Sequence, residues 1–366
     1  MRCEPFELER WLSTHKAKYN LSGLGPPGVK LSEIISPQEL DKELLYGDTR
    51  GSEELRILIA QTYEEINSDN VLVTTGTAEA NCLTLTTLVE PGDEAILIVP
   101  TYMQAYGLVR ALGAQVKLVH LDEKQNYTVP LEEVKNALSA KTKLIFYTNP
   151  NNPTGATMQG TDVEAICELA EDEQAFVVCD EVLRGLEMDG TLSTSPVGIY
   201  EKGISTGSLS KLGIRGIRIG WLAASESKMI QQAWPLKDYT TLSHSGLSER
   251  IASAAMKPDR LDWLRERARE SFRDGRKLLV NWVKENSSVL GCVPPSAGGS
   301  AFPQYFADLN SVTLAESLLK KEDVLIAPGT YFGSDKHFRI KFVPDDLQRL
   351  LEGFARIGRF LRQQSS

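Results

Sequence analysis

Short apolar runs alternate with amphipathic helical stretches between residues 71 and 225, and this alternation restricts the fold more than any other feature of the sequence. Runs that are apolar almost throughout are typical of strands buried on both faces, as in a parallel sheet. Strands that alternate with helices predict a layered α/β domain, whose ligands bind at the carboxyl ends of the strands. The runs are VLVTT (71–75), AILIVP (95–100), QVKLVHL (115–121), KLIFYTN (143–149), AFVVCD (175–180) and IRIGWLAAS (217–225).

The alternation ends after about residue 245. A charged helical region follows over 248–286, broken once by KPD, and then come a Pro/Gly-rich turn and an α+β tail with a final helix. The first 40 or so residues also lack the βα rhythm. We therefore expect three segments, which are 1–42 (packing with the small domain), 43–265 (the large domain) and 266–366 (the small C-terminal domain).

Composition excludes several classes of function. A net charge of −9 argues against a nucleic-acid binder, which needs a basic face. The five cysteines show no CxxC spacing and the four histidines are scattered, so neither a disulfide framework nor a metal site is expected. The N-terminus lacks the apolar segment of a signal peptide, and no apolar run could span a membrane. We expect a soluble, cytoplasmic protein.

Glycine marks the first strand-to-helix turn of the α/β region. VLVTT runs into GTAEAN, which begins at Gly76, and then into a helix. Such a turn leaves backbone N–H groups free at the positive end of the helix, where a phosphate binds well. The alternative is a plain glycine turn with a threonine cap.

Polar residues follow two further strands. In TNPNNPTG, flanking prolines could hold Asn152 toward a ligand, although proline-rich turns of this kind are common. In AFVVCDE, Asp180 ends an apolar strand, where a buried carboxylate is costly unless it meets a cation. The alternative for Asp180 is a capping role.

The stretch SLSKLGIRGIRIG, at 208–220, concentrates positive charge in an acidic chain. An S-x-x-K acyltransferase also needs Ser-Asp-Asn and Lys-Thr-Gly elements, which are absent, and the spacing is not that of a Walker motif. The spacing does allow Ser208 and Arg218 to hold a phosphate while Lys211 supplies an amine. A desolvated lysine beside other cations loses its proton easily and becomes a nucleophile toward an aldehyde.

Together these features resemble the class I/II aminotransferases of the aspartate aminotransferase superfamily, which are pyridoxal-phosphate (PLP) enzymes of fold type I. The resemblance extends from LSGLGPPG to FRIKF. It implies a large PLP-binding domain with a mostly parallel seven-stranded sheet between helices, plus a smaller α+β domain from both termini. Within the family, EPFELERW, PTYMQAYGL and VTTGTAEAN resemble the branch near capreomycidine synthase-type enzymes.

The resemblance implies roles at the reacting centre. Lys211 would form the internal aldimine with PLP and shuttle the proton, Asp180 would pair with the ring nitrogen, and Tyr102 would stack on the ring. Asn152 would bond the ring oxygen O3′. Arg339, in FRIKF, would clamp the substrate α-carboxylate.

Further residues would hold the cofactor phosphate or cover the substrate. The resemblance implies a homodimer with shared active sites, in which a tyrosine reaches the phosphate of the neighbouring subunit. Gly23 would lie in a loop over the substrate. The phosphate contacts would come from Gly76, Thr77, Ala78, Ser208, Arg218 and, across the interface, Tyr46.

Two departures from the family pattern stand out. The family usually has tyrosine three residues after the aspartate, and this chain has Leu183, which cannot donate to O3′. Arg218 follows Lys211 by seven residues where many relatives show eight.

Three functions remain open from the sequence. The first is transamination between an amino acid and a 2-oxo acid. The second is a PLP-dependent elimination, replacement or cyclisation, which Leu183 favours. The third is a regulator or binding module, which the presence of Lys211, Asp180, Asn152 and Arg339 disfavours. Lys237 aligns with a region that can bind a distal carboxylate, although a solvated lysine is the simpler interpretation.

Overall fold

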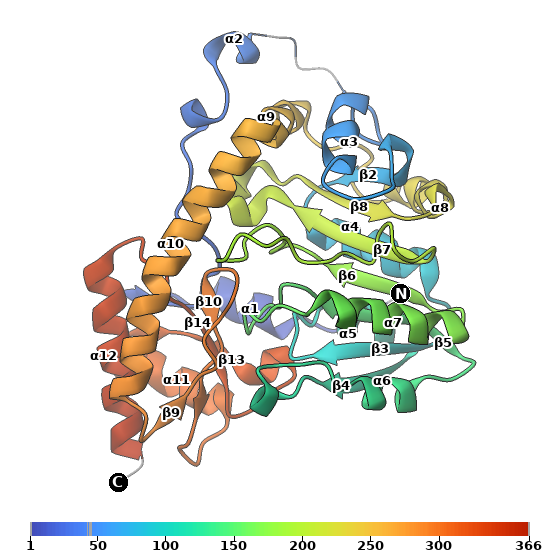
Figure 1. Ribbon diagram of the computed structural model, residues 1–366. Helices are drawn as coiled ribbons and strands as arrows, with labels where there is room; N and C mark the ends of the chain where they lie inside the picture. Colours follow the sequence, from blue (N-terminus) through green and yellow to red (C-terminus); the bar gives the residue numbers. More distant parts are fainter. Residues whose placement is uncertain (1, 42, 44–45, 365–366) are drawn as a thin grey trace.

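The computed structural model describes residues 2–41, 43 and 46–364. Its large domain is built on a seven-stranded sheet with the order β2-β8-β7-β6-β5-β3-β4 (Figure 1). Only β8 runs antiparallel to its neighbours, so the mostly parallel sheet is confirmed. The strands are β2 (Val71–Thr74), β3 (Glu94–Val99), β4 (Gln115–His120), β5 (Thr142–Thr148), β6 (Phe176–Asp180), β7 (Gly203–Ser208) and β8 (Gly220–Ala224).

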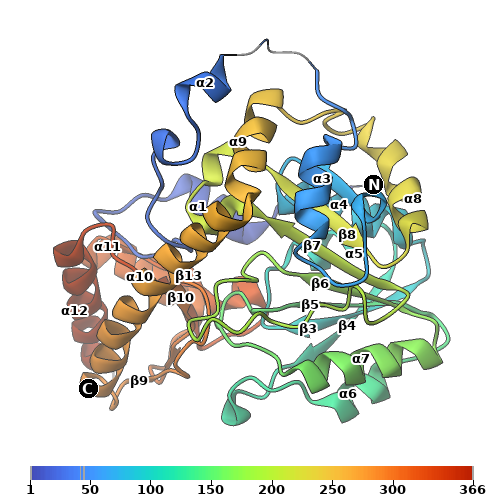
Figure 2. The same ribbon diagram turned by 45° about the horizontal axis from the view of Figure 1, so that its top comes forward.

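Helices cover both faces of this sheet (Figure 2). Alternate residues of β3 explain why: Leu97 packs in one hydrophobic cluster with α4, α5 and α8, while Ile96 and Ile98 pack in another with α6 and α7. Strands with two buried faces are typically apolar, as the sequence predicted for β3. The helices are α3 (Glu53–Ala60), α4 (Thr77–Leu88), α5 (Gln104–Ala111), α6 (Leu131–Ala137), α7 (Gly160–Asp172), α8 (Ser227–Lys237) and α9 (Gly246–Met256).

Strand β7 is the one central strand that the apolar pattern did not indicate. Its sequence, GISTGS, is small and polar, yet the whole strand is buried. A Cβ added at Gly207 would lie 2.6 Å from the ring of Trp221, so the neighbouring strand leaves no room for a larger residue. Thr206 and Ser205 satisfy their hydroxyls by hydrogen bonds to Asn81 and Tyr63.

The small domain joins both ends of the chain. Strand β1 (Tyr19–Asn20) pairs in parallel with β12 (Val324–Leu325), as expected for an N-terminal segment that packs with the tail. The other strands are β9 (Leu290–Gly291), β10 (Ser300–Ala301), β11 (Gln304–Tyr305), β13 (Ala327–Pro328) and β14 (Phe338–Lys341). The helices are α1 (Glu7–Thr14), α10 (Pro258–Glu285), α11 (Ser311–Glu322) and α12 (Leu347–Gln364). The short helix α2 (Pro37–Leu40) lies away from them, on the side of α9 (Figure 1).

Helix α10 connects the two domains. Its first residue is Pro258, which is why the helical region breaks after α9 at the KPD position. It continues without a break through residue 265. The expected boundaries at 42 and 265 stay predictions, and residue 42 lies outside the described residues.

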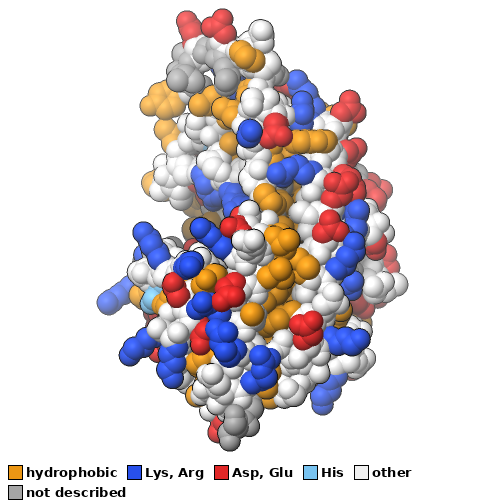
Figure 3. Space-filling view, turned by 90° about the vertical axis from the view of Figure 1, so that its left-hand side faces the viewer, with side chains coloured by type: hydrophobic (Ala, Val, Ile, Leu, Met, Phe, Trp, Pro, Cys, Tyr) orange, Lys and Arg blue, Asp and Glu red, His pale blue; other side chains and the backbone are white. Residues whose placement is uncertain are grey.

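Aromatic rings join α10 to α12 at the outer side of the small domain. Trp282 and Phe354 stack with ring centroids 4.7 Å apart, and the indole N–H of Trp282 donates to the carbonyl of Phe354 at 2.8 Å. Seen from the side on which these helices lie, a band of hydrophobic side chains runs between charged side chains of both signs (Figure 3).

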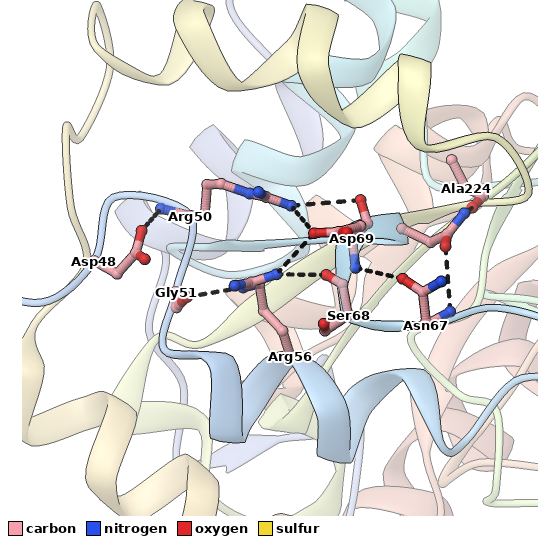
Figure 4. Close-up of polar contacts among 9 residues, drawn as sticks. Asp48, Arg50, Gly51, Arg56, Asn67, Ser68, Asp69 and Ala224 are labelled. Carbon is pink, nitrogen blue, oxygen red and sulfur yellow. Dashed lines mark hydrogen bonds and ion pairs between the residues drawn. The ribbon is translucent and has the colours of Figure 1, made fainter.

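A polar network fixes the loop before α3 to the edge strand β2 (Figure 4). Arg50 and Arg56 both reach the carboxylate of Asp69, at 3.2 and 3.8 Å. Arg56 also donates to the carbonyls of Ser68 and Gly51 at 2.7 and 3.0 Å. Gly51 has a φ of +94°, and a Cβ there would overlap Val73.

We predict that Gly51→Ala lowers stability by roughly 1–3 kcal/mol, because alanine must adopt a left-handed backbone and displace Val73. The midpoint of denaturant unfolding, followed by circular dichroism, measures this. Gly107→Ala is the matched control: it lies in α5 with nothing within 4 Å of an added Cβ, so stability should stay equal or rise. Equal midpoints for Gly51→Ala and wild type would contradict the packing of this loop.

Candidate active site

Asp180 is a buried carboxylate at the carboxyl end of β6. One oxygen accepts from the side-chain N–H of Asn81 at 3.1 Å and the other from the backbone N–H of Val182 at 3.0 Å. The second bond caps the turn after the strand, so the capping role and the predicted position coexist. Burial raises the pKa of Asp180, against the effect of its hydrogen bonds and of Lys211. Such a carboxylate suits a ligand N–H that carries positive charge.

Lys211 follows the next strand, β7, in the short 3₁₀ helix Leu209–Leu212. Its pKa falls from 10.5 to about 8, mainly through burial and then through the positive charges of Arg339 and Arg215. The charges of Asp180 and Glu9 act in the opposite direction. About half of the Lys211 side chains are therefore neutral amines near pH 8, whereas a solvated lysine is almost fully protonated at that pH.

Arg339 lies on β14 of the small domain and is buried. It donates to the amide oxygen of Asn152 at 3.0 Å and to the backbone carbonyl of Ser22 at 2.8 Å. Its guanidinium also lies over the ring of Phe332 at 4.9 Å. Burial lowers the pKa of Arg339 to about 10, so it remains a cation at neutral pH. Its Nε–H is buried with no partner among the described residues, and it can bind a carboxylate.

The predicted proline-rich turn lies beside this arginine, and its two asparagines have different partners. The amide oxygen of Asn151 accepts from the backbone N–H and the hydroxyl of Thr154, which holds the turn. Asn152 is buried and points to Arg339. The residue that the sequence singled out therefore lies at the site.

Gly76 and Arg218 form a second corner of the site at the start of α4. Gly76 is the residue before the helix, with a φ of +82°, and a Cβ there would overlap the guanidinium of Arg218. Arg218 also donates to the hydroxyl of Ser210 at 3.3 Å. The short loop from Lys211 to Arg218 thus ends in a left-handed residue, with a φ of +51° at Arg218, and still delivers its guanidinium to the helix start.

The same corner fits a phosphate. Thr77 does not cap the helix, and its buried hydroxyl has no hydrogen-bond partner among the described residues. Ala78 follows in the first turn of α4, and Ser208 lies at the end of β7 with its hydroxyl accepting from the backbone N–H of Ser210. A helix N-terminus, an orphan hydroxyl and a guanidinium together favour an anion.

Tyr102 lies between β3 and α5. Its hydroxyl donates to the carboxylate of Glu9 at 2.8 Å, and the ring of Phe6 contacts it edge-on at 4.9 Å between centroids. Burial and the negative charge of Glu9 raise the pKa of Tyr102, so the phenol stays protonated.

The N-terminal loop lies against the lysine. A Cβ on Gly25 would lie 3.7 Å from Cδ of Lys211, whereas Gly23 is exposed beside Lys341. The loop therefore reaches the site, with Gly25 rather than Gly23 closest to the amine.

Three other candidate residues make no side-chain hydrogen bond or ion pair to this cluster within the described part of the chain. Tyr46 is 92% exposed. Lys237 is fully buried in the large domain, donates to the carbonyl of Thr49 and lies 3.5 Å from His244, so it is neither solvated nor part of this site. Leu183 packs in the main hydrophobic core against Gly298.

Sequence reasoning missed three residues of the site: Asn81, Ser210 and Glu9. Asn81 follows Gly76 closely enough to lie in the first turns of the same helix, which could have indicated it. Ser210 lies within the SLSK stretch itself. Glu9 gave no signal, because it is one acid among several in an amphipathic helix.

The sequence profile of the family described as "Aminotransferase class I and II" matches residues 23–354. The chain belongs to this family. A capreomycidine synthase from Streptomyces vinaceus is 29% identical and aligns over 92% of this chain and 88% of its own. A PLP-dependent aminotransferase structure from Streptococcus suis matches with a TM-score of 0.92 and 29% identity over 100% of both chains. A structure of the PLP-dependent cyclase OrfR matches with a TM-score of 0.90 and 26% identity, over 99% of this chain and 98% of that one.

Family membership makes this chain a PLP-dependent enzyme of fold type I. Its site is consistent with that cofactor, since a half-buried amine, a buried carboxylate and an anion corner lie at the ends of neighbouring strands. Among the described residues no helix is long and apolar enough to cross a membrane, and no three potential ligand side chains gather around a metal position.

We predict that, in enzyme freed of its cofactor, Lys211 reacts with acetic anhydride with a midpoint near pH 8, whereas ordinary lysines titrate near 10.5. Competitive labelling and mass spectrometry measure both. Arg339→Gln should raise the Lys211 midpoint, because the guanidinium disfavours a second positive charge. An unchanged or lower midpoint in that variant would contradict the electrostatic account.

Proposed function

We propose that this chain catalyses transamination between an amino acid and a 2-oxo acid. The observation that carries the proposal is the half-buried amine of Lys211 after β7, whose pKa is lowered to about 8 and which lies close to the charges of Asp180 and Arg339. The family match and the S. suis aminotransferase support it.

PLP, when bound, supplies an aldehyde and an electron-accepting ring. Lys211 would hold it covalently and, once released by the substrate, would move the proton at the substrate's α-carbon. Asp180 would face the ring nitrogen and keep it protonated, and the hydrogen bond from Asn81 orients that carboxylate. Tyr102 would cover the ring. Because the amide oxygen of Asn152 already accepts from Arg339, its N–H group would be left to donate to O3′.

The remaining contacts hold the two anionic ends. Arg339, fixed by its hydrogen bond to Ser22, would bind the substrate α-carboxylate, and the loop that contains Gly23 would cover the substrate. The phosphate would be held by Gly76, Thr77, Ala78, Ser208 and Arg218, and Ser210 positions the guanidinium of Arg218.

We predict that borohydride reduction of the purified holoenzyme fixes PLP on Lys211. In a separate, unreduced sample, amino acids should convert the enzyme to its pyridoxamine form and release a 2-oxo acid. Peptide mapping and product mass measure both. Lys237 is the internal control, because it is also buried and has a lowered pKa but lies outside the site. If Lys237 is labelled, or if no residue is labelled after PLP is added, the assignment of Lys211 as the PLP-binding residue is wrong.

The second candidate function is elimination, replacement or cyclisation of an amino acid. The likeness to the cyclase OrfR and to capreomycidine synthase favours it, together with Leu183. The same product analysis separates the two functions, because ammonia or a cyclised product in place of a 2-oxo acid identifies the second.

We also propose that the protein is a homodimer whose two subunits share their active sites, and that it is located in the cytoplasm. Tyr46 is almost fully exposed in the single chain, although the loop that follows it is anchored at Arg50 and Arg56 (Figure 4). An exposed tyrosine close to a fixed loop suits contact with a partner subunit's phosphate. Five unpaired cysteines support a reducing compartment.

We predict that mixing Tyr46→Phe and Lys211→Ala subunits restores activity, because each mixed dimer then has one site free of both changes. Random mixing of inactive parents should give about a quarter of wild-type activity. Unmixed parents measured alone are the control. The proposal of a shared site would be wrong if light scattering showed a monomer under conditions where the enzyme is active. It would also be wrong if the mixtures were no more active than the average of the two parents.

A further inference from the structure

Helix α1 brings a carboxylate to the site from the beginning of the chain. Leu8 is fully buried with Phe302 and Phe332, and the indole N–H of Trp11 donates to the carbonyl of Ile326 at 2.8 Å. These contacts fix the helix against the small domain on both sides of Glu9. The position of the Glu9 side chain is therefore set by the fold.

Glu9 reaches the candidate site through Tyr102. Its carboxylate accepts from the Tyr102 hydroxyl at 2.8 Å, and its charge raises the pKa of both Lys211 and Arg339. Among the described residues Glu9 forms no ion pair, and its second oxygen accepts no hydrogen bond. Within the described ranges, the phenol of Tyr102 is therefore the only group at hydrogen-bond distance from this carboxylate.

This charge has a direct consequence for the substrate. In the proposed function Arg339 binds the α-carboxylate that all amino acids share, so the Glu9 carboxylate is left to contact the side chain of the substrate. A second carboxylate there would face like charge in a partly desolvated site, whereas a guanidinium or ammonium would gain a charge-assisted hydrogen bond. Lys237, the cation aligned with a distal-carboxylate position, is buried elsewhere and cannot reverse this preference.

We propose that Glu9 is a specificity-determining residue that selects amino acids with a positively charged side chain and rejects dicarboxylic ones. The proposal rests on the proposed function, because it assumes that Arg339 binds the α-carboxylate. It identifies the substrate class of the site without depending on whether transamination or cyclisation follows.

The test uses three carboxylic acids that carry no amine and so cannot react with the cofactor. They are 5-guanidinopentanoate (cationic end), hexanoate (apolar end) and adipate (anionic end). Their dissociation constants are measured by calorimetry on the holoenzyme. We expect the guanidino acid to bind roughly 10-fold or more tightly than hexanoate, and adipate to bind least tightly.

Variants assign the preference to one carboxylate. Glu9→Gln keeps an oxygen for Tyr102 but removes the charge, so the guanidino acid should lose its advantage over hexanoate. Glu9→Asp keeps the charge, so the guanidino acid should retain part of its advantage over hexanoate. Glu7→Gln is the matched control, since Glu7 is an exposed acid of the same helix and should leave the order unchanged.

Three outcomes would overturn the proposal: adipate binding as tightly as the guanidino acid, an unchanged order in Glu9→Gln, or a lost order in Glu7→Gln. Borohydride labelling of Lys211 in each variant shows that the site is folded and loaded. Failure of that labelling in the wild type refutes the proposed function, whereas normal labelling with an unaltered binding order in Glu9→Gln refutes only the role of Glu9.

Discussion

The site depends on keeping one carboxylate, Asp180, ionised where water cannot reach it. Burial disfavours its charge, and hydrogen bonds from Asn81 and Val182 offset part of that penalty. Asn81 in turn accepts from Thr206 at 2.7 Å. This short chain of hydrogen bonds links α4, β6 and β7, so the helix start that forms the anion corner and the strand that leads to Lys211 are fixed by the same contacts.

Charges around this centre limit one another. Arg339 and Arg215 lower the proton affinity of Lys211, while Asp180 and Glu9 raise it. A lysine among anions alone would keep its proton and be a poor nucleophile. The balance of charges from both domains, together with burial, brings the pKa of the Lys211 amine to about 8.

The sequence predicted most of the fold, because strands buried on both faces must be apolar. It failed at β7, where contact with Trp221 requires glycine and buried hydroxyls replace apolar side chains. Asp180 and Lys211 could be found because polar residues at strand ends stand out against apolar runs. Glu9 could not, because a glutamate in an amphipathic helix looks the same whether it faces solvent or a site. The partner of Tyr46 cannot be read from a single chain.

The parallel pairing of β1 with β12 has a consequence for how the protein is made. The first strand of the chain finds its partner only when residues 324–325 have been synthesised, and the carbonyl of Ser22 meets Arg339 later still. Helix α1, which packs on Phe302, Phe332 and Ile326, therefore lacks most of its docking surface during most of translation. The large domain can fold first, since its sheet ends at residue 224, and the covered pocket is completed only as the last part of the chain emerges.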